Sequence, residues 1–188
     1  MHSNHTHRVN EDSMTMQNET KGSKLAGKIR KVAHPQKSAE SSENLRFYTK
    51  YAAFVLKVLR KPRFQKFLKW ILRREKIEED MVEDVQVRFF PFQKENGNGL
   101  AGRYKGKGRI LIFPKRFEFC QELMQEHGKE KALSYIEKRA QATLIHEFLH
   151  AKYAGDEEKV RKLTKKYFDI FSENSESANE LSQMLFKE

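Results

Sequence analysis

Two histidines and a glutamate that lie within one turn of a predicted helix are the residues best suited to chemistry in this sequence. They occur in the run HEFLH at residues 146–150. A spacing of four residues places His146 and His150 on one face of a helix, where both imidazoles can bind a single tetrahedral metal ion. Glu147 would then project towards a water molecule on that metal, accept its proton and later return the proton to a leaving amine. The run therefore predicts a metal site with Glu147 as general base and acid.

The metal that suits this set of ligands best is zinc (Zn²⁺), because imidazoles favour it over Mg²⁺ or Ca²⁺. A catalytic zinc ion usually takes three protein ligands and one water, so a third ligand must lie elsewhere in the chain. The favoured candidate is Asp156, six residues after His150 and just past Gly155, which can turn the chain back. Asp156 could instead cap the following helix. The alternatives that remain open are Glu157, Glu158, Glu176 and Glu180.

The elements that must position these residues are mostly helical in pattern. Residues 117–125 predict a short helix that stops near Gly128, and residues 129–153 predict a longer helix that contains the two histidines. Residues 156–171 form a further amphipathic pattern after the Gly155 cap. Tyr153 shares the helical face of His146, so it could stabilise an oxyanion, although a core aromatic is the other reading.

Strand-like sequence precedes these helices. Residues 84–92 alternate and are β-rich, and two further strand patterns cover residues 100–104 and 109–113. The Gly/Asn-rich segment 95–99 and the segment 105–108 predict turns between them. We therefore expect a small antiparallel sheet of three strands within an α+β domain.

A strongly cationic region lies further upstream. Residues 43–79 have a helical pattern that Pro62 interrupts, which predicts a helical hairpin. Between Leu45 and Arg74 there are ten Lys or Arg and no acidic residue. Such a surface could bind the phosphate backbone of DNA or RNA, lie on an anionic membrane, or simply face solvent. The residues assigned to nucleic-acid binding are Lys57, Arg60, Lys61, Arg63, Lys66, Lys69, Arg73 and Arg74.

Composition sets the remaining expectations. Residues 1–42 are rich in Ser, Asn, Thr, Lys and Gln, which predicts a disordered basic arm. The formal charge of +11 makes an acidic partner plausible, and the single cysteine, Cys120, excludes a multi-cysteine zinc site. The chain shows neither a secretory signal nor an apolar run long enough to span a membrane. These features favour an intracellular, cytoplasmic protein.

The segment HEFLHAKYAGDEEKVRKLTKKYF, residues 146–168, resembles the active-site region of the zincin metallopeptidases. Within that group it is most similar to minimal SprT-like or WLM-like domains, whose third ligand lies six residues beyond the second histidine. That ligand is generally histidine, whereas Asp156 stands at the position here. The resemblance implies a minimal zincin-like metallopeptidase domain over residues 80–188, with a helix beneath the metal and a small sheet above it.

The same resemblance implies a function. A zincin cleaves peptide bonds by attack of zinc-bound water and binds extended substrate along an edge strand, here residues 102–104 or 109–113. SprT-like proteases degrade proteins attached to DNA, which suits the cationic segment 43–79. One alternative is a nucleic-acid-binding protein with a structural or vestigial zinc site. Another is a metal-dependent hydrolase that acts on RNA or nucleotides.

Overall fold

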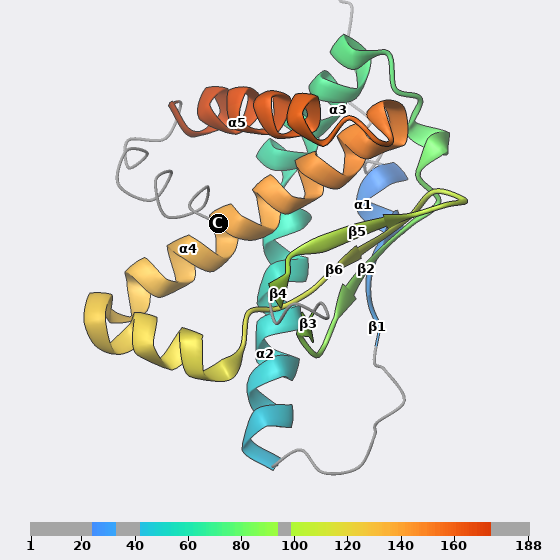
Figure 1. The fold of residues 1–188 in the computed structure, drawn as a ribbon. Helices are drawn as coiled ribbons and strands as arrows, with labels where there is room; N and C mark the ends of the chain where they lie inside the picture. Colours follow the sequence, from blue (N-terminus) through green and yellow to red (C-terminus); the bar gives the residue numbers. More distant parts are fainter. Residues whose placement is uncertain (1–23, 33–41, 94–98, 174–188) are drawn as a thin grey trace, which may run out of the picture.

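A mixed β-sheet with long helices packed against it forms the core of the molecule (Figure 1). The computed structural model describes residues 24–32, 42–93 and 99–173. Buried side chains from the sheet and from all the long helices form one hydrophobic cluster. The predicted α+β class is therefore confirmed. None of the described helices is long and apolar enough to cross a membrane.

The main sheet has four strands in the order β1-β2-β6-β5. β1 pairs with β2 in parallel, as does β2 with β6, and only β5 and β6 are antiparallel. The three predicted strand segments do form strands, but the prediction of a three-stranded antiparallel sheet is wrong. After β2 the chain passes through a separate two-stranded sheet, β3-β4, and then through β5. It turns back after β5, so that β6 runs parallel to β2. The strands are β1 (Ile29–Val32), β2 (Asp84–Arg88), β3 (Phe92–Gln93), β4 (Gly99–Leu100), β5 (Gly102–Lys105) and β6 (Arg109–Ile112).

The fourth strand comes from the segment that we predicted to be disordered. Helix α1 (Lys24–Lys28) leads directly into β1, so the prediction for residues 1–42 is wrong over residues 24–32. Two apolar side chains explain the order, because Leu25 and Ile29 are fully buried. Arg30 adds a bidentate ion pair to Asp84 in β2, at 2.7 and 2.8 Å. The rest of the predicted arm lies outside the described residues.

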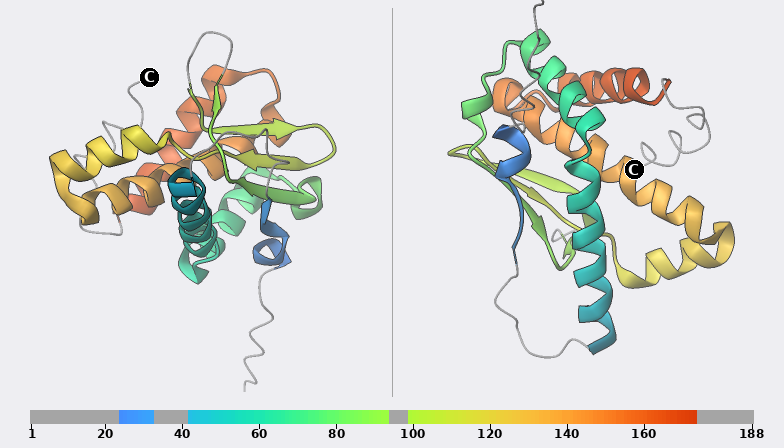
Figure 2. Two further views of the ribbon diagram at one scale, coloured as in Figure 1. Left: turned by 90° about the horizontal axis from the view of Figure 1, so that it is seen from below. Right: turned by 180° about the vertical axis from the view of Figure 1, so that it is seen from behind.

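The two cationic helices form where the sequence predicts them, as α2 (Ser42–Leu59) and α3 (Pro62–Glu75). They do not make a hairpin, because α3 runs on from the end of α2 instead of folding back along it (Figures 1 and 2). Pro62 starts the new helix at its first turn, where a missing N–H costs nothing. α2 packs against the sheet and α4, whereas aromatic side chains of α3 meet α5. A short 3₁₀ turn, η1 (Glu79–Met81), then leads to β2.

The C-terminal helices agree with the prediction. α4 (Phe117–Tyr153) contains a break at Gly128, whose φ of 82° and ψ of 163° are not helical, so two helices meet there as expected. A positive φ costs glycine little, which explains why the break falls on this residue. α5 (Glu157–Glu173) then packs back along the second half of α4 (Figure 1).

Candidate metal centre

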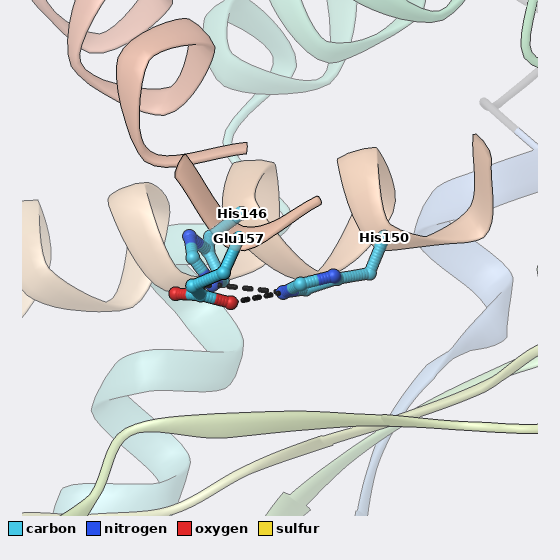
Figure 3. Close-up of side chains that lie close together, drawn as sticks. All are labelled: His146, His150 and Glu157. Carbon is cyan, nitrogen blue, oxygen red and sulfur yellow. Dashed lines mark hydrogen bonds and ion pairs between the residues drawn. The ribbon is translucent and has the colours of Figure 1, made fainter. Parts of the chain in front are cut away.

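Three ligand-type side chains converge where α5 begins to run back over α4. His146 and His150 extend from adjacent turns of α4, and Glu157, the first residue of α5, reaches towards both (Figure 3). The two Nε2 atoms are 3.1 Å apart. The Glu157 oxygens lie 3.2 Å from Nε2 of His150 and 3.6 Å from Nε2 of His146. Tetrahedral zinc with bonds of about 2.05 Å requires ligand atoms about 3.3 Å apart, so the triangle fits a zinc ion.

Hydrogen bonds on the far sides of the imidazoles direct both Nε2 lone pairs into this triangle. Nδ1 of His150 lies 3.0 Å from the Ala154 carbonyl oxygen, which can only accept. Nδ1 of His146 lies 3.3 Å from the Thr164 hydroxyl, which already donates its proton to the Val160 carbonyl oxygen at 2.7 Å. Both Nδ1 atoms must therefore carry the hydrogen, which leaves Nε2 as the metal-binding atom.

The electrostatic environment keeps His146 in the form that binds metal. Burial, reinforced by the neighbouring His150, lowers the pKa of His146 to about 4, although Glu157 opposes the shift. A neutral imidazole needs to lose no proton on metal binding. The carboxylate of Glu157 supplies a negative charge beside the two imidazoles, as a divalent cation requires.

Glu147 lies on another side of α4, between that helix and β5. It is 5% exposed, and the backbone of Tyr104 hydrogen-bonds to its carboxyl group. Burial raises the pKa of Glu147 to about 7, and the Glu157 charge adds to the shift. Gly102 makes this position available, because a Cβ at residue 102 would lie 2.6 Å from Oε1 of Glu147. The carboxyl group is thus enclosed between the helix and the edge strand.

The carboxylate that lies close to both histidines is that of Glu157, one of the alternatives left open by the sequence, and the candidate group does not include Asp156. Asp156 caps α5 instead, since its Oδ1 accepts a hydrogen bond from the Lys159 N–H at 3.0 Å. The shorter side chain, that of Asp156, forms the cap, and the side chain of Glu157 points at the histidines. Glu158 pairs with Lys162 on the surface. Glu176 and Glu180 lie outside the described residues.

Tyr153 does not belong to the group formed by His146, His150 and Glu157, which is called the metal group below. Its hydroxyl donates to Glu75 of α3 at 2.6 Å, and Tyr167 of α5 donates to the same carboxylate. Burial alone would raise the pKa of Glu75, but the two tyrosine hydrogen bonds, together with the charges of Lys152 and Arg74, lower it. The bond to Glu75 raises the pKa of Tyr153 to about 12. Tyr153 therefore fastens α4 to α3 and does not serve as an oxyanion donor in this arrangement.

The predicted nucleic-acid-binding residues are divided between several environments. Most are exposed along α2 and α3, whereas Lys69 is half-buried and lies 3.7 Å from Glu79. Lys61 forms an ion pair with Glu137 at 2.5 Å, and Arg60 donates to the Ile29 carbonyl oxygen. The guanidinium groups of Arg63 and Arg74 lie over the rings of Phe171 and Trp70. The remaining members, Lys57, Lys66 and Arg73, are exposed.

The sequence analysis did not identify two residues of the site, Thr164 and Gly102. Thr164 could have been found as a hydrophilic position on the inner face of the predicted last helix. Gly102 is one of several glycines in the strand region, and only its contact with Glu147 distinguishes it. Comparison with protein-family models, with curated proteins and with solved structures found no match to this chain. The interpretation of the site therefore depends on its geometry.

Replacing Glu157 by Gln should weaken zinc binding by more than about 100-fold, because losing even an outer-shell partner costs about 10- to 100-fold. Asp156→Asn is the matched control, since asparagine also caps helices well and should leave zinc affinity unchanged. Both affinities can be measured by competition with a chelator. Loss of zinc in the Asp156 variant alone would restore the original assignment.

Thr164→Val should lower zinc affinity by about 10- to 100-fold, because the His146 Nδ1–H loses its acceptor. Thr164→Ser keeps the hydroxyl and should restore the affinity. The same chelator competition measures both, with circular dichroism to compare folding. Equal affinities in the Val and Ser variants would show that the hydroxyl does not orient the imidazole.

Proposed function

We propose that this protein is a zinc-dependent metallopeptidase of the HExxH type. The observation that carries the proposal is the combination of a zinc-sized triangle of His146, His150 and Glu157 with the buried carboxyl group of Glu147, the next residue on α4, whose pKa the Glu157 charge helps to raise. A purely structural metal site has no use for such a carboxyl group. Zinc is proposed because two imidazoles and one carboxylate are typical ligands of catalytic zinc and leave a fourth position open.

The edge strand β5 is the element best placed to receive a substrate. It lies at the end of the sheet order, and among the described strands only β6 pairs with it. An extended peptide can therefore add along its free side by main-chain hydrogen bonds. Of the two strands that the resemblance to zincins left open, β6 is interior and only β5 is at the edge. Gly102 in β5 approaches Glu147, so a peptide on this strand would pass close to the proposed base.

Glu147 has the properties that proton transfer in both directions requires. A pKa of about 7 is near neutrality, where a carboxyl group can take a proton and give it back. A cation bound to the neighbouring ligands would favour the ionised form that accepts the proton. Zinc, when bound, lowers the pKa of a water ligand and polarises a carbonyl group. Glu147 would accept the proton of the attacking water and transfer it to the departing amine.

Glu147→Gln should abolish peptide hydrolysis and leave zinc content unchanged, because the amide fills the same space but cannot take a proton. General acid–base groups typically contribute about 10²- to 10⁴-fold to the rate. Casein or a peptide library serves as substrate, with RNA in parallel. Full activity in this variant would overturn the metallopeptidase proposal, and cleavage of RNA alone would favour the hydrolase alternative.

A second candidate function, nucleic-acid binding, has its own support on the outer face of α3. Trp70 is 40% exposed and stacks on Phe67, with ring centroids 5.4 Å apart. The guanidinium group of Arg74 lies over the Trp70 ring, and Lys66 and Arg73 are exposed on the same helix. Aromatic faces that stack with bases beside cations that contact phosphates are typical of single-strand binding surfaces. Together with the proposed peptidase, this face suits a substrate that is associated with nucleic acid.

The double variant Lys66→Glu/Arg73→Glu should weaken binding of single-stranded DNA and reduce the salt dependence of that binding, since each phosphate contact contributes to the slope. Fluorescence anisotropy with a labelled oligonucleotide measures both quantities. Lys131→Glu, an exposed charge reversal on α4, controls for net charge. If the control weakens binding as much as the double variant, the effect is non-specific and the α3 surface is not the binding site.

A further inference from the structure

The free edge of β5 presents main-chain groups next to the proposed base (Figure 1). The Phe113 N–H donates to the Ala101 carbonyl oxygen at 2.9 Å, so residues 101 and 113 are a hydrogen-bonded pair of the antiparallel ladder. Because such pairs alternate along two antiparallel strands, the main-chain groups of Gly102 and Tyr104 point away from β6. The backbone of Tyr104 hydrogen-bonds to Glu147 on this side. A peptide added to β5 would therefore lie beside Glu147.

The two faces of β5 differ in chemistry. A Cβ at residue 102 would lie 2.6 Å from Oε1 of Glu147, so the side-chain position of Gly102 faces α4. Successive side chains of a strand point to opposite faces, which places Arg103 and Lys105 on the face away from α4. Both of these side chains are exposed. A peptide paired with β5 would thus meet two positive charges, two residues apart, on one of its faces only.

Positive charge is concentrated on the hairpin that β5 and β6 form. Lys105 lies directly opposite Arg109 in the ladder, and like charges at opposed positions destabilise a strand pair. Asp84 in β2 lies opposite Arg109 on its other side, but the same carboxylate forms the ion pair with Arg30. A carboxylate beside β5 would reduce the repulsion between Lys105 and Arg109. Residues 102–112 contain no acidic residue and four cationic ones, Arg103, Lys105, Lys107 and Arg109.

Arg103 is placed to bind a carboxylate at the start of β5. Its guanidinium group lies over the ring of Phe92, 5.9 Å from the centroid. Phe92 is 43% exposed and packs on Phe113, with ring centroids 5.5 Å apart. A guanidinium group over a ring face keeps N–H groups in its own plane available, and a carboxylate can accept two of them.

We propose that the free edge of β5 binds extended acidic peptides that carry Asp or Glu at alternate positions, and that such segments are the preferred substrates. The substrate role rests on the proposed peptidase function. Alternate carboxylates bind Arg103 and Lys105, and the side chains between them face α4. The free main-chain groups favour a peptide over a nucleic acid, because a phosphate backbone cannot continue the ladder.

Fluorescence anisotropy tests the binding surface with the full chain and no added zinc, so that the proposed hydrolysis does not consume the peptide. Three labelled peptides of equal length serve as probes: alternating Glu and Thr, alternating Lys and Thr, and a block of Glu followed by a block of Thr. We expect the alternating acidic peptide to bind tightest, because the block peptide also places glutamates against Glu147. Its binding should weaken as salt is raised. Equal or tighter binding of the block peptide would overturn the proposal.

Charge variants of β5 should change the preference between the peptides. Arg103→Gln/Lys105→Gln should weaken binding of the alternating acidic peptide by about 2- to 30-fold, the value of two exposed ion pairs. Arg103→Glu/Lys105→Glu should prefer the Lys peptide. Lys129→Glu/Lys131→Glu makes the same change in net charge at exposed positions of α4 and should bind like wild type.

Two results with these variants would overturn the proposal. One is equal binding of the acidic peptide by wild type and both β5 variants. The other is tighter binding of a single-stranded DNA oligonucleotide than of the acidic peptide, with loss of the DNA in the β5 variants, which would assign the surface to nucleic acid.

Hydrolysis with zinc separates this inference from the proposed function. We expect a lower KM for the alternating acidic peptide than for the Lys peptide, and a rise in that KM in Arg103→Gln/Lys105→Gln. Cleavage of both peptides with equal KM would overturn the acidic preference and support the peptidase. Selective binding of the acidic peptide without any cleavage would support the surface and overturn the peptidase.

Discussion

Two imidazole nitrogens whose lone pairs point at each other across 3.1 Å repel unless a cation lies between them. A proton on one nitrogen or a metal ion bound by both relieves the repulsion, so the two compete for the same lone pairs. The surrounding structure maintains this arrangement. The Ala154 carbonyl oxygen and the Thr164 hydroxyl each hold one ring from behind, and Glu157 adds a carboxylate in front. A metal ion satisfies all three ligands at once, whereas a proton satisfies only one pair.

The return of α5 along α4 is the element of the fold on which that arrangement depends. The turn at residues 154–156 brings Glu157 to both histidines and Thr164 to the back of His146. Glu75 secures the turn from the side of α3, since it accepts hydrogen bonds from Tyr153 at the end of α4 and from Tyr167 in α5. The cationic helix α3 is therefore linked physically to the metal group, and a ligand on α3 would contact an element that supports the site.

Glu147 and β5 show what the sheet would contribute to the proposed chemistry. The histidines and the glutamate share one helix but face different neighbours, because adjacent residues on a helix point about 100° apart. The histidines face α5, and Glu147 faces the edge strand, where the absence of a side chain at Gly102 leaves room for it. Burial at this interface brings the pKa of Glu147 to about 7. The sheet thus provides both the environment of the proposed base and a free edge for an extended peptide.

The sequence alone determined the features that local patterns control. Helical periodicity and glycine conformation are local properties, so the features that follow from them could be predicted. These are the placement of His146 and His150 on one helix face, the break at Gly128 and the helices on either side of Gly155. The strand segments could also be predicted, because alternating β-rich residues and turn residues are local patterns too. The pairing of the strands could not be predicted, because parallel or antiparallel pairing depends on the path of the chain between them. The order of β1 could not be predicted either, because it depends on the burial of Leu25 and Ile29 in the tertiary structure.

Only the tertiary structure decided between residues of similar chemistry that lie side by side. Asp156 and Glu157 are both acidic and both follow the turn, and the start of α5 decides which of them caps the helix and which is directed at the histidines. The hairpin expected of α2 and α3 failed for a related reason, since helix propensity fixes each helix but not the angle between them. Long-range packing sets that angle, and it also places Thr164 and Gly102 at the site.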